Sequence, residues 1–369
     1  MQRAIYMDWN ATAPVHPAAR AAMLAALEDC GNPSSVHGFG RRARKRIEDA
    51  RSALAALVGA KVENIVFTAG GTEANALMLA NRGARRLIVS AIEHDSILKP
   101  AQDAATIRVD RNGVVDLDHL KALLASDARP ALVALMLANN ETGVIQPVAQ
   151  AAEIARAHDA LLHVDAAQAI GRVPVTLDVL GADFLTVSGH KFGAPQGVGA
   201  LIAAKSPQIV PLLQGGGQER NRRAGTENVP AIAGLGAAVA ALEPSEAARI
   251  GSLRDALEQR LAGTDPSAIV FGAKASRLPN TLCFASGEKS AETLVMALDL
   301  AGVAISAGSA CSSGKVKPSH VVTAMGFDRD VASRAIRVSL GRDSTEADID
   351  AFFSAWQHIH APRQMTAAA

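Results

Sequence analysis

The chain has 369 residues, of which 49% are hydrophobic and 20% charged, and its formal net charge at pH 7 is +1. This length allows one large domain with a smaller one attached, because single cores rarely grow past about 250–300 residues. The near-zero charge argues against direct binding of nucleic acid or of an anionic membrane surface. The sequence also contains no apolar run of the roughly 18 residues that a membrane span requires.

The cysteines and the N-terminal residues bear on the compartment. Cys30, Cys283 and Cys311 are an odd and sparse set that does not fit a disulfide framework. The first residues, MQRAIYMDWNATAPVHP, lack the apolar segment of a signal peptide. Together these features predict a protein of the reducing cytoplasm.

The first predicted element is a basic helix. The segment GRRARKRIEDAR, residues 40–51, leads directly into SALAALVGA, in which apolar residues recur at helical spacing. Such a run of cations could bind phosphate, but it is more typical of the solvated face of an amphipathic helix. We therefore predict an exposed basic face here rather than a ligand site.

Seven short apolar runs follow, and helical patterns such as residues 72–82 and 148–159 alternate with them. The runs are nearly all apolar rather than alternating, which is typical of strands covered on both faces. Strand–helix alternation at this spacing predicts a mostly parallel sheet between helices. The predicted strands comprise residues 64–68, 86–90, 106–109, 131–136, 161–164, 183–187 and 199–203.

The character of the sequence changes after Asn228. An alanine-rich helical stretch over about 230–262 leads into a mixed segment of short strands and helices that runs to the end. We interpret this segment as a smaller α+β domain that the first residues of the chain join. The predicted domains are residues 15–255 for the large one, and residues 1–14 with 256–369 for the small one.

Polar side chains collect after five of the predicted strands. In a sheet of this type, ligands bind beyond the carboxyl ends of the strands. Each residue taken alone has an ordinary structural explanation, as a helix cap, a hydrogen-bonded histidine or a solvated lysine. Their convergence on one sheet edge is what predicts a site. The residues are Gly71 and Thr72 in AGGTEAN, His94 in AIEHDS, Asn139, Asn140 and Glu141 in ANNETG, Asp165 and Gln168 in DAAQAIG, and Ser188, His190 and Lys191 in SGHKFGAPQG.

These residue types suit pyridoxal 5'-phosphate (PLP). Free backbone amides at a helix start, as near Gly71, can bind a phosphate. A lysine such as Lys191 forms a Schiff base with the aldehyde, and a carboxylate such as Asp165 keeps the pyridine nitrogen protonated. A flat side chain such as His94 can stack over the ring, and an Asn or Gln can hydrogen-bond its phenolic oxygen.

Several motifs of the chain resemble those of the cysteine desulfurases, the NifS/IscS-like group of the class V aminotransferase family. They are SGHK ending in Lys191, HVDAAQ (163–168), ANNETGVIQP (138–147), GGGQERNRRAGTEN (215–228) and SAGSACSSG (306–314). The resemblance covers nearly the whole chain, from YMDWNATAP (6–14) to AIRVSLGR (335–342). It implies an α/β protein of the PLP-dependent transferase fold type I. The large domain would hold a mostly parallel seven-stranded sheet between helices, and the smaller α+β domain would carry the cysteine loop.

The resemblance also implies a role for each matching residue. Lys191 would hold the cofactor covalently, Asp165 would face the pyridine nitrogen, and His94 would stack on the ring and assist proton transfers. Arg337 would bind the substrate carboxylate, which the fork of its guanidinium suits. The other implied contacts are Asn140 and Gln168 near the phenolic oxygen; Thr72, Ser188, His190 and the backbone of Gly71 on the phosphate; Thr226 on the phosphate bound by the other subunit of a homodimer; and Asn10, Asn32 and Arg223 as lesser contacts.

Cys311 lies in the glycine- and serine-rich segment AISAGSACSSG (304–314), whereas Cys283 lies in the apolar run TLCFA and is predicted to be a core residue. The resemblance implies that the Cys311 thiolate attacks the sulfur of L-cysteine, takes it up as a persulfide and leaves L-alanine. Gly308 and Gly314 fit a mobile loop that carries sulfur to an acceptor protein, for iron–sulfur cluster assembly or thiolation. The chain departs from the family pattern after Lys191, where FGAPQG stands in place of the common Tyr-Gly-Pro-Lys.

Three alternative kinds of function fit the sequence less well. A selenocysteine lyase or an aminotransferase would use the same cofactor site, and Cys311 favours desulfuration, although a selenium substrate would fit the same pocket. A sulfur-relay protein with an inactive site would not need the complete set of Lys191, Asp165, His94, Arg337 and Cys311. A dinucleotide-binding dehydrogenase would need a G-x-G-x-x-G after the first strand, where the sequence reads AGGTEAN.

Overall fold

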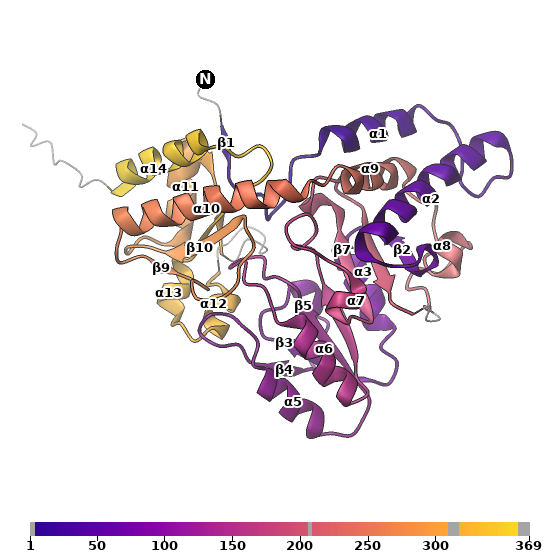
Figure 1. The fold of residues 1–369 in the computed structure, drawn as a ribbon, viewed down its shortest axis with the longest axis horizontal. Coiled ribbons are helices and arrows are strands. Elements are labelled where there is room, and N and C mark those ends of the chain that lie inside the picture. Colours follow the sequence, from indigo (N-terminus) through magenta and orange to yellow (C-terminus); the bar gives the residue numbers. More distant parts are fainter. Residues whose placement is uncertain (1–3, 206–208, 309–316, 361–369) are drawn as a thin grey trace, which may run out of the picture.

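The computed structural model describes residues 4–205, 209–308 and 317–360. Its centre is a seven-stranded sheet with the strand order β2-β8-β7-β6-β5-β3-β4 (Figure 1). The pairs β3–β4, β3–β5, β5–β6 and β6–β7 are parallel, and β8 runs antiparallel to both β2 and β7. The mostly parallel sheet is therefore confirmed, and the strand ends differ from the predicted ones by two residues at most. The strands are β2 (Ile65–Thr68), β3 (Arg86–Ser90), β4 (Ala105–Ile107), β5 (Ala131–Met136), β6 (Leu161–Asp165), β7 (Phe184–Ser188) and β8 (Gly199–Ala203).

Helices cover both faces of this sheet, which is why its strands are apolar throughout. In β2, Ile65 and Phe67 pack into one core, whereas Val66 points to the opposite face and packs into a second core. The second core includes residues of α3 (Gly71–Ala80) and α4 (Asp95–Leu98). The first core includes residues of α1 (Pro17–Leu27), α2 (Gly38–Val58), α5 (Leu117–Ala125), α6 (Val148–Ala157), α7 (Leu177–Leu180) and α9 (Val229–Ala240).

The single helical stretch predicted over 230–262 is in fact two helices, α9 (Val229–Ala240) and α10 (Pro244–Thr264). Pro244 fits the first turn of α10, where no amide hydrogen is needed, but it could not continue α9. Within the described ranges, no helix has both the length and the apolar character needed to cross a bilayer.

The predicted basic face lies on α2, where the cations within residues 41–45 are exposed. Arg51 departs from that prediction, because only 3% of its side chain is exposed. Its guanidinium donates a hydrogen bond of 2.8 Å to each carboxylate oxygen of Glu219. A buried charge needs such a partner, so the prediction of an exposed basic face was wrong for Arg51.

Glu219 belongs to an unusual turn, α8 (Gln218–Asn221). Three successive residues there have positive φ angles, +47° at Glu219, +58° at Arg220 and +64° at Asn221. The left-handed conformation costs L residues roughly 1–2 kcal/mol each. The buried pair with Arg51, and a hydrogen bond of 2.9 Å from the Phe67 amide to Glu219 Oε2, fix this turn to the edge strand β2.

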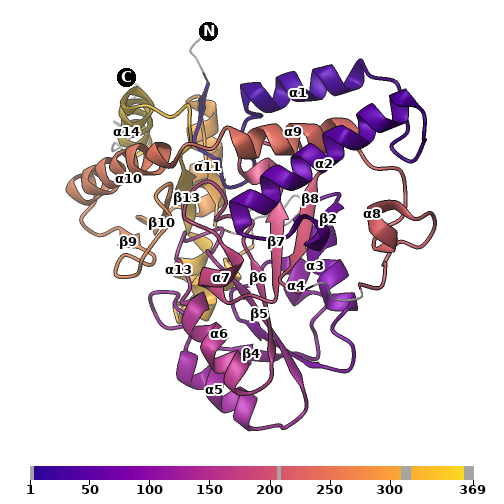
Figure 2. The same ribbon diagram turned by 45° about the vertical axis from the view of Figure 1, so that its right-hand side comes forward.

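A second, smaller part of the molecule lies beside the large sheet (Figure 2). The N-terminal strand β1 (Ile5–Tyr6) pairs in parallel with β11 (Val303–Ala304). A four-stranded sheet has the order β12-β13-β10-β9. The predicted boundary at residue 255 stays a prediction, and α10 runs through this position without a break. The remaining elements are β9 (Ile269–Val270), β10 (Thr281–Ala285), α11 (Ala291–Leu300), β12 (Ser306–Ala307), α12 (His320–Ala324), α13 (Arg329–Ser333), β13 (Ile336–Ser339) and α14 (Glu346–His360).

Candidate active site

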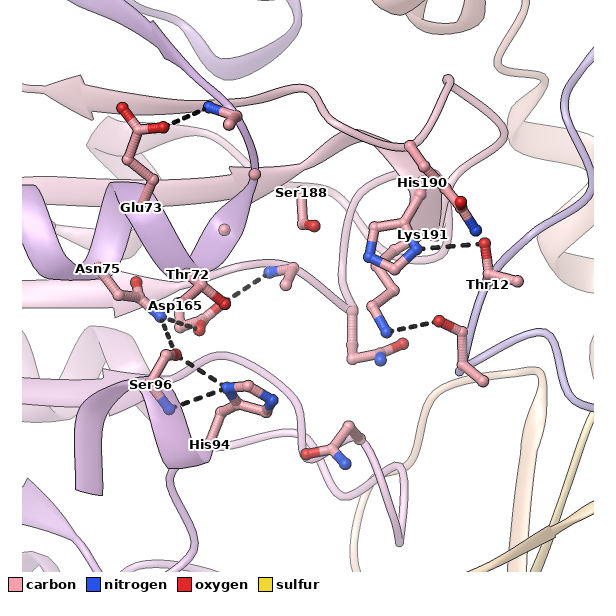
Figure 3. Close-up of a pocket in the computed structure, with 18 of the residues that line it drawn as sticks. Thr12, Thr72, Glu73, Asn75, His94, Ser96, Asp165, Ser188, His190 and Lys191 are labelled. Atoms are coloured by element: carbon pink, nitrogen blue, oxygen red, sulfur yellow. Dashed lines mark hydrogen bonds between the residues drawn. The ribbon is translucent and has the colours of Figure 1, made fainter. Parts of the chain in front are cut away.

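A cavity of about 860 Å³ lies beyond the carboxyl ends of the parallel strands, between the large sheet, the N-terminal segment and β13. Its lining comes from segments far apart in the sequence, which meet because parallel strands end at the same edge. Figure 3 shows several of these side chains directed toward one another. The predicted residues that line the cavity are Asn10, Gly71, Thr72, His94, Asn140, Asp165, Gln168, Ser188, His190, Lys191 and Arg337.

The start of α3 lies close to the end of β7. A Cβ atom at Gly71 would come within 3.2 Å of the Ser188 Cβ, so glycine permits this close approach. The N-cap residue of α3 is Gly70, which has no side chain to cap the first turn. Its amides therefore offer an anion site with Thr72 and Ser188 at its rim.

Asp165 is the last residue of β6 and is 7% exposed. Its Oδ1 accepts a hydrogen bond of 2.9 Å from the Ala167 amide, and its Oδ2 accepts one of 2.9 Å from Asn75 Nδ2. Both oxygens thus act as acceptors, which fixes the orientation of the carboxylate in the cavity.

His94 precedes α4 and acts as its N-cap. Its Nδ1 accepts a hydrogen bond of 3.1 Å from the Ser96 amide and lies 2.8 Å from Ser96 Oγ. Because a backbone N–H can only donate, Nδ1 is an acceptor, and the neutral ring carries its proton on Nε2.

Lys191 follows β7 in the short helical turn η2 (Gly189–Lys191). Its Nζ donates hydrogen bonds of 2.7 Å and 2.9 Å to the carbonyl oxygens of Asn10 and Ala11. Burial, together with the neighbouring Lys191 charge, lowers the pKa of His190 to about 4. His190 is therefore neutral at pH 7 and can meet an anion only through a hydrogen bond.

Arg337, on β13, is 1% exposed and forms the opposite wall of the cavity. Its Nη2 lies 2.7 Å from Asp8 Oδ1, and its Nη1 donates a hydrogen bond of 2.8 Å to the Asn140 carbonyl. Its Nε has no hydrogen-bond partner among the described residues. The guanidinium is thus held in place with donor capacity to spare.

Five predicted site residues lie outside the cavity of this chain: Asn139 and Glu141, which are buried, and Thr226, Arg223 and Asn32. Thr226 is exposed. The Arg223 guanidinium pairs with Glu73, at 2.9 Å, and Asn32 Oδ1 accepts from the Ser34 amide at 2.8 Å. Cys311, the predicted nucleophile, and Gly314 lie outside the described residues. Cys283 is buried, as predicted.

Sequence reasoning missed several polar residues of the site. Asn75, Ser96 and Thr12 line the cavity, and Asp8 holds Arg337. Only Asn75 carried a signal in the sequence, because asparagine is a poor former of helix interiors. Ser96 bonds its near neighbour His94 as part of an ordinary helix cap, and the partners of Thr12 and Asp8 are far away in the chain, so a single sequence does not reveal their roles.

Two buried carboxyl groups lie just outside the cavity lining. Burial raises the pKa of Glu93 to about 8, even though it accepts hydrogen bonds from Ser90 Oγ and the Met136 amide. Burial likewise raises the pKa of Glu141 to about 7, and its Oε2 accepts a hydrogen bond of 2.5 Å from Ser319.

The donor set of the cavity fits pyridoxal 5'-phosphate, the cofactor that the resemblance implies. The amides at the start of α3, with the hydroxyls of Thr72 and Ser188, suit the phosphate. An oriented carboxylate at Asp165 suits the pyridine nitrogen, and the Lys191 amine suits the aldehyde. His94 offers a flat ring at the same cavity.

Comparison with known proteins agrees with this fit. The family model "Aminotransferase class-V" matches residues 5–352. The protein "Cysteine desulfurase IscS" of Dictyoglomus turgidum is 41% identical over 368 residues, which cover 95% of this chain and 93% of that protein. A cysteine desulfurase of Rhodobacter capsulatus is 44% identical over 366 residues, or 94% of each chain.

The fold is shared as well. The X-ray structure of a NifS-like protein from Rickettsia africae matches with a TM-score of 0.91 at 37% identity, covering 97% of this chain and 99% of that chain. Since the family model and these relatives span nearly the whole sequence, the chain belongs to the aminotransferase class-V family.

Proposed function

We propose that this chain is a PLP-dependent cysteine desulfurase, which converts L-cysteine to L-alanine and takes the sulfur onto Cys311. The observation that carries the proposal is the convergence of Lys191, Asp165, His94 and Arg337 on one cavity. The relatives described above, which are named cysteine desulfurases, support the same activity.

Arg337 would bind the carboxylate of the substrate. Asp8 and the Asn140 carbonyl fix the plane of its guanidinium, so a carboxylate would meet a preset donor array. This contact would orient the amino group of the substrate toward Lys191, across the cavity.

The cofactor, when bound, would supply an electron-withdrawing ring that makes the substrate Cα acidic. Lys191 would supply an amine that can take and return a proton at the substrate Cα. Asp165 offers an acceptor to the ring nitrogen, and His94 holds its proton on Nε2.

The sulfur step conserves atoms without an external oxidant. The Cys311 thiolate attacks the substrate sulfur, the C–S bond of cysteine breaks as an S–S bond forms, and protons complete the methyl group of alanine. The products are L-alanine and a persulfide on Cys311, which an acceptor thiol can then take up.

The test measures alanine and sulfide released from L-cysteine in the presence of a reductant. We expect Cys311→Ala to keep bound PLP, with its yellow absorbance near 400 nm as a rough guide, and to release almost no sulfide. Lys191→Ala should lose that absorbance together with turnover. Full activity of Cys311→Ala on cysteine would contradict the proposal and favour a lyase or an aminotransferase.

The proposal includes a homodimer in which Thr226 reaches the phosphate of the other subunit. Asn32 and Arg223 are proposed separately, as lesser contacts to the substrate. The exposure of Thr226 outside the cavity of its own chain supports this arrangement. Mixed dimers of Lys191→Ala and Thr226→Ala test it. If Thr226 acts across the interface, one of the two sites in each mixed dimer is intact and activity returns; if it acts within its own chain, both sites stay defective.

The sulfur acceptor would be a protein of iron–sulfur cluster assembly or a thiolation enzyme. The names IscS and NifS among the relatives support a protein of this kind. A reducing cytoplasm, inferred from the sparse cysteines, would keep both the Cys311 thiol and an acceptor thiol reduced.

A further inference from the structure

Asn75 connects two groups of the cavity that the proposed function uses. It lies on α3 and is 1% exposed. Its Nδ2 donates one hydrogen bond of 2.9 Å to Asp165 Oδ2 and another of 2.9 Å to Ser96 Oγ. An amide nitrogen carries two hydrogens, so both are used (Figure 3).

The neighbours of this amide determine its orientation. Rotated by half a turn, Asn75 would set its Oδ1 against the carboxylate of Asp165, oxygen against oxygen. In the observed orientation, Oδ1 is buried and has no hydrogen-bond partner among the described residues. A buried oxygen without a partner is unfavourable, so the site leaves one acceptor unsatisfied in order to keep Nδ2 between Asp165 and Ser96.

Asn75 and His94 are joined through Ser96 by two hydrogen bonds that run from donor to acceptor in the same direction. Ser96 Oγ accepts from Asn75, and its own hydrogen is then available to His94 Nδ1, 2.8 Å away. The Ser96 amide donates to the same Nδ1. One amide nitrogen therefore contacts the carboxylate directly and the imidazole through a single hydroxyl.

We propose that Asn75 is a positioning residue that couples the Asp165 carboxylate to the His94 ring. The inference rests on the proposed function, in which these two groups contact the edge and the face of the same cofactor ring. Asn75 holds them in one relative geometry, and through Ser96 it supports the tautomer of His94 with its proton on Nε2. Loss of the Asn75 donors would remove one support of each group at once, leaving Asp165 on the Ala167 amide and His94 on Ser96.

Three variants separate positioning from general structure. Asn75→Leu removes both donors at similar volume. Ser96→Ala keeps the Asn75–Asp165 hydrogen bond and the Ser96 amide, and removes only the hydroxyl link. Asn81→Leu is the matched control, because Asn81 lies at the end of the same helix and donates to the carbonyls of Leu77 and Val210, away from the cavity.

The first readout is the affinity of the full-length, cofactor-free chain for PLP, measured by titration. We expect Asn75→Leu to weaken binding about tenfold, the loss of one hydrogen bond to a charged group. Ser96→Ala and Asn81→Leu should stay within about twofold of wild type, because both keep the Asn75–Asp165 contact.

The second readout is the pH midpoint of the visible absorbance of the loaded protein, followed by kcat and KM for cysteine. Asn75→Leu should move the midpoint by about one pH unit and lower kcat about tenfold with little change in KM. Ser96→Ala should lower kcat by a few-fold at an unchanged midpoint. Asn81→Leu should lower Tm and leave the midpoint, kcat and KM unchanged.

The proposal is wrong if Asn75→Leu behaves like Asn81→Leu, with a lower Tm but wild-type PLP affinity, midpoint and kcat. If the leucine variant does not fold, Asn75→Ala takes its place in the same comparison. A wild-type chain that binds PLP but makes no alanine from cysteine would reject the proposed function. The PLP affinity and the absorbance midpoint would still decide the role of Asn75 in that case.

Discussion

The edge of the large sheet at β2 and the wall of the cavity at β13 each bury an arginine beside a carboxylate, and the two arginines are used differently. Arg51 donates from all three guanidinium nitrogens, to Glu48, Glu219 and the Ile65 carbonyl. Arg337 donates from two, and its Nε has no partner in the described structure. Arg51 uses four of its five N–H donors on protein groups, whereas Arg337 uses two and lines the cavity, so Arg337 keeps Nη hydrogens for a ligand. Donor use together with a place in the cavity lining thus separates these two arginines, which burial alone does not.

The largest expected effect on stability comes from breaking the buried Arg51–Glu219 ion pair. Arg51→Met keeps much of the side-chain volume but leaves Glu219 buried without a cation. We expect the free energy of unfolding to fall by about 4 kcal/mol, measured by urea denaturation, while KM for cysteine changes by less than about twofold. A large rise in KM with unchanged stability would reverse the assignment of the two arginines.

Arg337→Lys is the counterpart in the cavity. Lysine keeps a cation beside Asp8 but lacks the planar fork, so we expect KM for cysteine to rise about hundredfold. The unfolding free energy should drop by less than it does in Arg51→Met. Steady-state kinetics and PLP titration together check this prediction, since PLP affinity should stay at the wild-type value.

Glu93 extends the comparison to a buried carboxyl group that has no arginine or lysine partner among the described residues. Burial raises its pKa to about 8 from an ordinary 4.5, so the folded state binds the proton more tightly than the unfolded state. The resulting stabilisation is complete below about pH 4.5 and is lost as the pH rises through 8. We expect wild type to lose on the order of 2 kcal/mol more stability than Glu93→Gln between pH 5 and pH 8.5. Parallel urea curves for the two proteins at both pH values would contradict this.

Asp8→Asn should have the smallest effect. The amide keeps the shape of the side chain and still accepts from Arg337 Nη2, but it removes the charge that holds the guanidinium. We expect KM to rise only about fivefold, with kcat near wild type. An unchanged KM would mean that the Asn140 carbonyl alone sets the position of Arg337.

The large sheet was predictable from the sequence because its strands are buried on both faces. Continuous apolar runs marked β2 to β8, and polar residues at their ends marked Asp165, His94 and Lys191. The break between α9 and α10 was missed because alanine favours helix on both sides of Pro244, and the helical periodicity hides the interruption.

The residues that hold the site residues in place were not predictable in the same way. The contacts Asn75–Asp165 and Asp8–Arg337 join residues far apart in the chain, and only the fold reveals such pairs. The prediction of an exposed basic face on α2 was wrong at Arg51 for a related reason. Arg51 belongs to the basic run by composition, but the approach of Glu219 in three dimensions decides that it is buried.

The left-handed turn at Glu219, Arg220 and Asn221 has a consequence for how two copies of the chain would meet. It is fixed within one chain, by Arg51 and the Phe67 amide, and it precedes Thr226 in the same segment. A segment shaped before contact loses little conformational entropy on association. In the proposed dimer, this turn would therefore dock without first having to fold.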